Sequence, residues 1–232
     1  MTDVVRTALR VLTFRASGEE LRALDRRHLA LGLAATWIVG IGRTWDDPTA
    51  PLLRRTGIGS LAYVVFLALV LFAVAAPLQR SREHRLTLER VLTFVTLTAP
   101  PAALYAIPVE RFVSIDTAIR MNLAFLAVVA GWRVALLFSF LLRGAALSPL
   151  ATLTAALLPL AAIVLALVRL GHADHVMQIM GGLRERHPEE GVSTVLFLLS
   201  ALSIVAAPVL ALTWIALAVQ AHRARHRVEA CP

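Results

Sequence analysis

The sequence predicts an all-α protein, a polytopic transmembrane helix bundle of five or six membrane helices. The first observation is composition: 58% of the 232 residues are hydrophobic and 16% are charged, whereas a soluble domain is about 45–50% apolar and about 25% charged. The second is that long apolar stretches recur along the whole chain. A bilayer accommodates outward apolar faces that water would not, and we expect no separate soluble domain.

The first 28 residues are more polar than the rest. They carry apolar residues at helical spacing, with arginines on another face, which predicts a cytoplasmic amphipathic segment lying on the membrane surface. These residues are Val5, Leu9 and Leu12 on one face, and Arg6 and Arg10 on the other. Ser17 and Glu20 fit a capping box, so we expect a second helix to begin there and to run into the membrane.

The transmembrane bundle is expected over residues 29–221, followed by a basic C-terminal tail at 222–232. The first apolar run, 29–42, is short for a hydrocarbon core of about 30 Å. It is either re-entrant or the end of the longer helix that starts near Ser17, and this leaves the number of spans at five or six. The longer runs cover residues 56–79, 91–109, 121–142, 144–168 and 191–221.

The distribution of arginine predicts the orientation of the bundle. All 23 basic residues are arginine, and with the N-terminus inside, fourteen fall on the cytoplasmic side and eight outside. Basic loops stay in the cytoplasm, so we expect a cytoplasmic N-terminus in a bacterial inner membrane. The same basic loops account for the net charge of +8. We therefore do not expect nucleic-acid binding, since the sequence shows no nucleic-acid recognition fold.

Arg133 is the most informative single residue, because it is a charge deep inside the predicted span 121–142. A guanidinium at the bilayer centre costs about 2.5–3.5 kcal/mol and should face protein or water. No acidic residue lies inside a predicted span. One interpretation is that Arg133 donates to backbone carbonyls, and the other is that it binds an anionic ligand or lipid headgroup in a polar cavity.

The span 91–109 contains adjacent prolines, which release the carbonyls four residues earlier. Pro100 and Pro101 would free the carbonyls of Thr96 and Leu97, to which Arg133 could donate. Broken helices also form substrate sites in transporters. The candidate ligand-binding residues are therefore Arg133, Thr96, Pro100, Pro101, Tyr105 and Glu110, the last being the nearest carboxylate that we expect to dip toward Arg133.

Metal and catalytic chemistry receive little support. Asp46 and Asp47 favour a turn beside the interfacial Trp45, since adjacent acids without spaced ligands are a weak metal signal. His172 to His175, and His222 with His226, lack the placement that zinc requires. Cys231 is the single cysteine, and no nucleophile or phosphate-loop motif is present. We expect no catalytic residue, no metal site and no cofactor.

Several segments within residues 29–180 carry a resemblance to known proteins. They are Gly42-Arg43-Thr44-Trp45-Asp46-Asp47-Pro48, Ala99-Pro100-Pro101-Ala102 with Glu110-Arg111-Phe112, and Gly131-Trp132-Arg133. The chain resembles bacterial multi-pass membrane proteins with a Yip-type layout, an amphipathic start followed by five closely spaced hydrophobic helices. The resemblance implies a role in membrane organisation, and no catalytic residue can be carried over from it.

The sequence thus leads to three functional hypotheses. The first is a non-enzymatic membrane scaffold whose partners are membrane lipids, other membrane proteins or itself, and not nucleic acid. The second is a small transporter or channel for an anionic or amphiphilic solute, using Arg133 and the Pro100–Pro101 break. The third is a lipid-modifying enzyme that uses Asp46, Asp47 and the segment His172 to His175.

Overall fold

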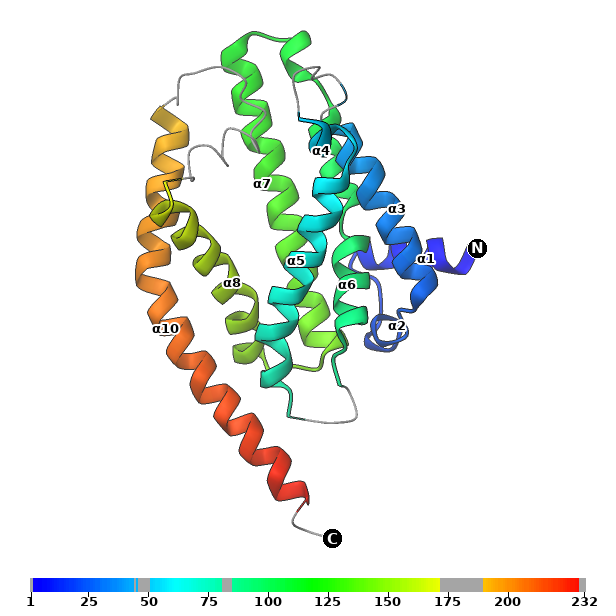
Figure 1. Ribbon diagram of the computed structural model, residues 1–232, viewed down its shortest axis with the longest axis vertical. Coiled ribbons are helices and arrows are strands. Elements are labelled where there is room, and N and C mark those ends of the chain that lie inside the picture. Colours follow the sequence, from blue (N-terminus) through cyan, green and yellow to red (C-terminus); the bar gives the residue numbers. More distant parts are fainter. Residues whose placement is uncertain (1, 44, 46–50, 81–84, 172–189, 230–232) are drawn as a thin grey trace.

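The computed structural model describes residues 2–43, 45, 51–80, 85–171 and 190–229. Within these residues the chain is helical and contains no strand, so the all-α prediction is confirmed (Figure 1). The elements are α1 (Thr2–Leu12), α2 (Gly18–Arg22), α3 (Arg26–Gly42), α4 (Leu52–Arg55), α5 (Ile58–Ala75), η1 (Ala76–Leu78), α6 (Leu88–Leu97), η2 (Pro100–Ala106), η3 (Val109–Arg111), α7 (Ile115–Ser139), a π-helical turn η4 (Phe140–Gly144), α8 (Pro149–Arg169) and α10 (Glu190–Glu229).

Four helical segments of the described chain are long and apolar enough to cross a membrane, and a fifth qualifies if a bent pair counts as one span. The helix α3, with 17 residues, is not among them. The four are Ile58–Leu78, Ile115–Gly144, Pro149–Arg169 and Phe197–Arg225, and the bent pair is Leu88–Leu97 with Pro100–Arg111. Counting the bent pair as one span gives five, the lower of the two expected numbers, and leaving it out gives four.

The N-terminal segment contains the predicted capping box, but the helix it starts is short. The Ser17 hydroxyl accepts from the backbone N–H of Glu20 at 3.2 Å, and Glu20 accepts from the N–H of Ser17 at 2.7 Å. The prediction that this helix runs into the membrane is wrong, because α2 ends at Arg22. The Asp25 carboxylate accepts from the N–H groups of Arg27 and His28 and starts α3 as a separate helix.

The helix α1 divides its apolar residues between two environments. Ala8 and Val11 are buried against the bundle, whereas Val5 and Leu9 are 43% and 56% exposed. One flank of α1 thus packs on protein, and the other is free to enter lipid, as expected for a helix lying in the interface. The segment between α1 and α2 contains Phe14, which adopts a left-handed conformation (φ 62°).

The proline pair breaks its helix as predicted. The axis bends by 41° between α6 and the segment Pro100–Arg111. On the N-terminal side of the break, α6 packs so closely on α3 that a Cβ atom on Gly32 would overlap the Thr96 hydroxyl. On another face, the Phe94 ring stacks on Phe140 of the π-helical turn with centroids 4.2 Å apart. These contacts place α6 in the centre of the N-terminal half.

The last two long helices lie along one edge of the bundle, where α10 runs beside α8 (Figure 1). The Trp214 indole donates to the carbonyl of Val74 at 2.8 Å and ties α10 to α5. The helix continues through the expected basic tail to Glu229, and its C-terminal turns extend past the other helices (Figure 1). Within an apolar stretch of 18 residues in α10, only 6% is buried inside the bundle, compared with 28–39% in the corresponding stretches of the other three spans.

Candidate functional site

Arg133 lies on the face of α7 that is turned into the bundle. Val129, one turn before it, and Leu136, one turn after it, are 2% and 1% exposed, and residues at these spacings share a helix face. Arg133 itself is partly buried. It is eleven positions before Gly144, which places it about 16 Å along the axis from that end of the span. The predicted interior position of this charge is therefore confirmed.

Two phenols lie in the same region as the Arg133 guanidinium. Tyr63 on α5 and Tyr105 on η2 are both close enough to act on it electrostatically, and the chain contains two tyrosines in all. The guanidinium of Arg43, at the end of α3, lies 5.1 Å from the centre of the Tyr105 ring. Four elements distant in sequence thus contribute to one cluster of two cations and two phenols.

Among the described residues, no hydrogen bond or ion pair satisfies the Arg133 guanidinium. Glu110, the carboxylate expected to approach it, instead accepts a hydrogen bond from the Asn122 side chain at 2.8 Å. Asn122 is three turns before Arg133 on α7, about 16 Å along the axis. Glu110 is therefore part of a separate contact near the start of α7.

The carbonyls released by the prolines are not bonded to Arg133. The Thr96 carbonyl accepts from the Thr36 hydroxyl of α3 at 3.3 Å and from the N–H of Ala99 at 3.1 Å. The Thr96 hydroxyl is buried and donates to the carbonyl of Thr93 at 2.9 Å. Thr96 is thus used in packing α6 on α3, while Pro100 and Pro101 serve to begin η2, which positions Tyr105.

Two tryptophans bind backbone carbonyls. The indole of Trp45 donates to Ala106 at 2.9 Å, and its ring lies 5.4 Å from the Arg111 guanidinium. The indole of Trp132 donates to Leu12 at 2.9 Å, and Phe14 stacks on it at 6.3 Å. Trp132 therefore packs the N-terminal segment onto α7 and takes no part in the cluster around Arg133.

The remaining candidates lie largely outside the described residues. These are Asp46, Asp47 and the segment His172 to His175; the side chain of His226 is also not described, while His222 is exposed. Across the described part of the chain, no group of three or more His, Cys, Asp or Glu residues is placed to hold a metal ion. The hypothesis of a lipid-modifying enzyme rests on residues outside the described part of the chain, so it stays a hypothesis.

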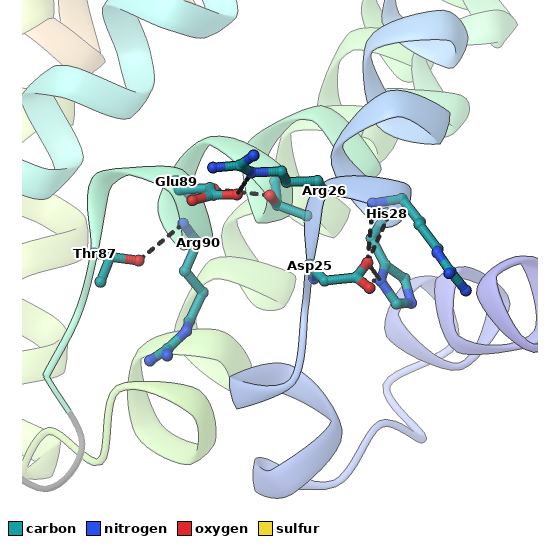
Figure 2. A network of polar contacts seen from close by, with 8 residues as sticks. Asp25, Arg26, His28, Thr87, Glu89 and Arg90 are labelled. Carbon is teal, nitrogen blue, oxygen red and sulfur yellow. Dashed lines mark hydrogen bonds and ion pairs between the residues drawn. The ribbon is translucent and has the colours of Figure 1, made fainter.

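A second polar cluster lies at the opposite ends of α3 and α6, and Figure 2 shows it. Arg26 and Glu89 form an ion pair at 3.3 Å, and the His28 ring nitrogen Nδ1 lies 2.6 Å from the Asp25 carboxylate. The hydrogen bond from the His28 side chain holds the pKa of Asp25 below its ordinary value of 3.8. The Arg26–Glu89 pair joins the start of α3 to the start of α6, whereas the contact between Asp25 and His28 is local to the start of α3.

The Arg133 cluster has the chemistry of an anion site. Arginine is a fixed cation with five donors, and the phenols can donate as well as accept. Within the described part of the chain, the ionisable groups that act on Arg133 are these two phenols. Tyr63 and Arg43 were missed by the sequence reasoning. The rarity of tyrosine in the chain is the signal that could have indicated Tyr63.

The fold and this cluster define a class: an all-α bundle with four or five helices apolar enough to cross a membrane, and an inward-facing arginine that is unpaired within the described chain. No protein-family model, curated protein or solved structure matches the chain. The resemblance to proteins of Yip-type layout thus stays an expectation.

Proposed function

We propose that the protein is a non-enzymatic, polytopic membrane protein that binds the anionic group of an amphiphile within its bundle at Arg133. The observation that carries this proposal is the inward-facing guanidinium without a hydrogen-bond or ion-pair partner among the described residues, within electrostatic range of Tyr63 and Tyr105. An unpaired cation inside a membrane span is costly, and an anion held by Arg133 and the two phenols would lower that cost.

The proposal includes the location and orientation expected from the sequence: a bacterial inner membrane with the N-terminus in the cytoplasm. The arginine bias between the two sides supports this orientation. Transport of the bound amphiphile is an extension of the same proposal, since the bend at Pro100 lies directly before η2 and Tyr105, and interrupted helices form substrate sites in transporters.

The test is purification in native-lipid nanodiscs followed by mass spectrometry of the retained small molecules. Arg133→Gln removes the charge and keeps a polar side chain, and Arg120→Gln is the matched control, because Arg120 is an exposed arginine on the same helix. We expect an anionic species that is retained by the parent and by Arg120→Gln and is lost from Arg133→Gln. Identical retained species in all three proteins would contradict the proposal.

A second candidate function is a membrane scaffold, and the exposure of α10 favours it. Its 29-residue span is far less buried than the others, and the large apolar side chains of Phe197, Val205 and Leu212 are 71%, 69% and 69% exposed. A protein partner retained in stoichiometric amount, and lost when this face of α10 is changed to alanine, would favour the scaffold.

A further inference from the structure

The helix α1 presents three sides of different character. Ala8 and Val11 pack against the bundle and are 7% and 3% exposed, whereas Val5 and Leu9 form an exposed apolar side. The side that carries Arg6 is exposed as well. A helix at the boundary between lipid headgroups and acyl chains has this pattern, because its apolar residues face the chains and its charges face the headgroups.

Three contacts hold this segment at one level of α7. The Trp132 indole donates to the carbonyl of Leu12 at 2.9 Å, and its ring stacks on Phe14 with centroids 6.3 Å apart. The guanidinium of Arg143 donates to the carbonyl of Phe14 at 3.1 Å. The position of α1 along the bundle is therefore determined by contacts with α7.

That level is well inside the α7 span. Trp132 is eleven positions before Arg143, which corresponds to about 16 Å along the helix axis. Figure 1 shows α1 lying across the bundle between the two ends of α7, with α2 closer than α1 to the end that α7 reaches at the π-helical turn. The helix α1 thus lies deeper than the end of the span that it contacts.

The length of α7 leaves room for this arrangement. The span Ile115–Gly144 has 30 residues and is about 45 Å long, whereas a hydrocarbon core is about 30 Å thick. Residues 115–132 alone cover about 27 Å. In the remaining segment, Leu136, Phe140 and Leu141 are 1–2% exposed, so protein rather than lipid covers these side chains.

We propose that α1 binds the lipid surface below the level of the surrounding headgroups and thins the bilayer locally beside α7. Asp3, Arg6 and Arg15 are exposed at a level that would be hydrocarbon in an undisturbed bilayer. Charges at such depth are reached by water and headgroups through local thinning. The exposed side chains of Val5 and Leu9 then contact the acyl chains directly under these headgroups.

The experiment measures the depth of nitroxide labels on the full chain in vesicles of phosphatidylcholine and phosphatidylglycerol. Oxygen reports contact with acyl chains, and a water-soluble nickel complex reports contact with water. Single labels replace Leu9, Leu142 and Leu150 in a Cys231→Ser background, since Cys231 is the single cysteine. Leu142 and Leu150 are 41% and 53% exposed. They lie near the adjacent ends of α7 and α8, and α8 is on the opposite side of the bundle from α1 in Figure 1.

We expect oxygen to reach the labels at 9 and 150, and the nickel complex to reach the label at 142. The variant Arg6→Leu with Arg15→Leu removes the charges that require headgroups, so its label at 142 should lose nickel contact and gain oxygen contact. Arg27→Leu with Arg120→Leu is the control, because both arginines are exposed and lie outside the segment 2–16. Its labels should behave as in the parent.

Equal accessibility at 142 and 150 in the parent would overturn the proposal, because the bilayer would then be uniform around the bundle. A label at 9 reached by the nickel complex and not by oxygen, or the same change in variant and control, would overturn it as well. If the double variant does not fold, Arg6→Leu alone decides. Arg133→Gln should leave all three labels unchanged, so this test is separate from that of the anion site.

Discussion

The hydroxyl of Thr36 donates to the backbone carbonyl of Thr96 across the interface between α3 and α6, at 3.3 Å. Thr96 is four residues before Pro100, which has no N–H to give to that carbonyl. The N–H of Ala99 still donates to the Thr96 carbonyl at 3.1 Å, and the Thr36 side chain of the neighbouring helix adds a second donor in the place of the N–H that Pro100 lacks. In a membrane interior such a donor has to come from protein, because water is not present to provide it.

Thr36→Val should lower the free energy of unfolding by about 1 kcal/mol, since it removes a buried donor while keeping the shape of the side chain. The measurement is reversible unfolding in mixed micelles. The same substitution in a Pro100→Ala background should cost less, because that background restores a backbone N–H that can bind the Thr96 carbonyl. An equal cost in both backgrounds would show that the Thr36 bond does not compensate for the proline.

Gly32→Ala should destabilise the bundle by about 1–3 kcal/mol, because the added methyl group would overlap the Thr96 hydroxyl and overpack the α3–α6 contact. Gly131→Ala is the matched control: a Cβ atom there meets nothing within 4 Å, and alanine favours the helix by about 1 kcal/mol. Unfolding measured side by side should therefore give opposite signs. Equal effects would exclude close packing at Gly32.

Trp132→Phe should loosen the N-terminal segment, because it removes the indole that donates to the Leu12 carbonyl. A bond of about 1 kcal/mol corresponds to about fivefold faster amide exchange in residues 2–16. Trp37→Phe is the control, since the Trp37 indole donates to the carbonyl of Thr56 instead. Hydrogen exchange that stays unchanged in Trp132→Phe, or rises equally in both variants, would contradict this role.

Local signals in the sequence were enough for much of the fold. Composition predicted the all-α bundle, Ser17 and Glu20 predicted a cap, and Pro100 and Pro101 predicted the bend. The same signals did not show that α2 stops after one turn, because the competing cap at Asp25 begins a new helix. The local signals also did not predict that α3 is a separate helix of 17 residues, because its length depends on where both of its ends are capped.

The candidate site was less predictable, since it depends on contacts between distant segments. Arg133 was identified from a local property, a charge inside an apolar run. Its neighbours Tyr63, Tyr105 and Arg43 come from three other elements, and no spacing along the chain relates them. Glu110 was expected to approach Arg133, yet its carboxylate accepts a hydrogen bond from Asn122 near the start of α7. The hydrogen-bond partner of Glu110 is thus determined by tertiary packing.

The start of α3 should show a defined dependence on pH. The hydrogen bond from His28 holds the pKa of Asp25 below 3.8 in the folded protein, so ionised Asp25 is favoured by folding. Its contribution is fully present above pH 3.8 and is lost as the pH falls through the lower, folded-state value. Asn at this position still caps a helix but does not titrate.

The unfolding temperature of the parent should therefore exceed that of Asp25→Asn at about pH 6, and the difference should shrink as the pH falls below 3.8. Taking the difference between two proteins in the same micelle cancels the titration of the other carboxylates. His28→Ala removes the largest cause of the shift, so the Asp25→Asn difference in that background should depend less on pH. A difference that stays constant, or grows in acid, would show that His28 does not stabilise the ionised carboxylate.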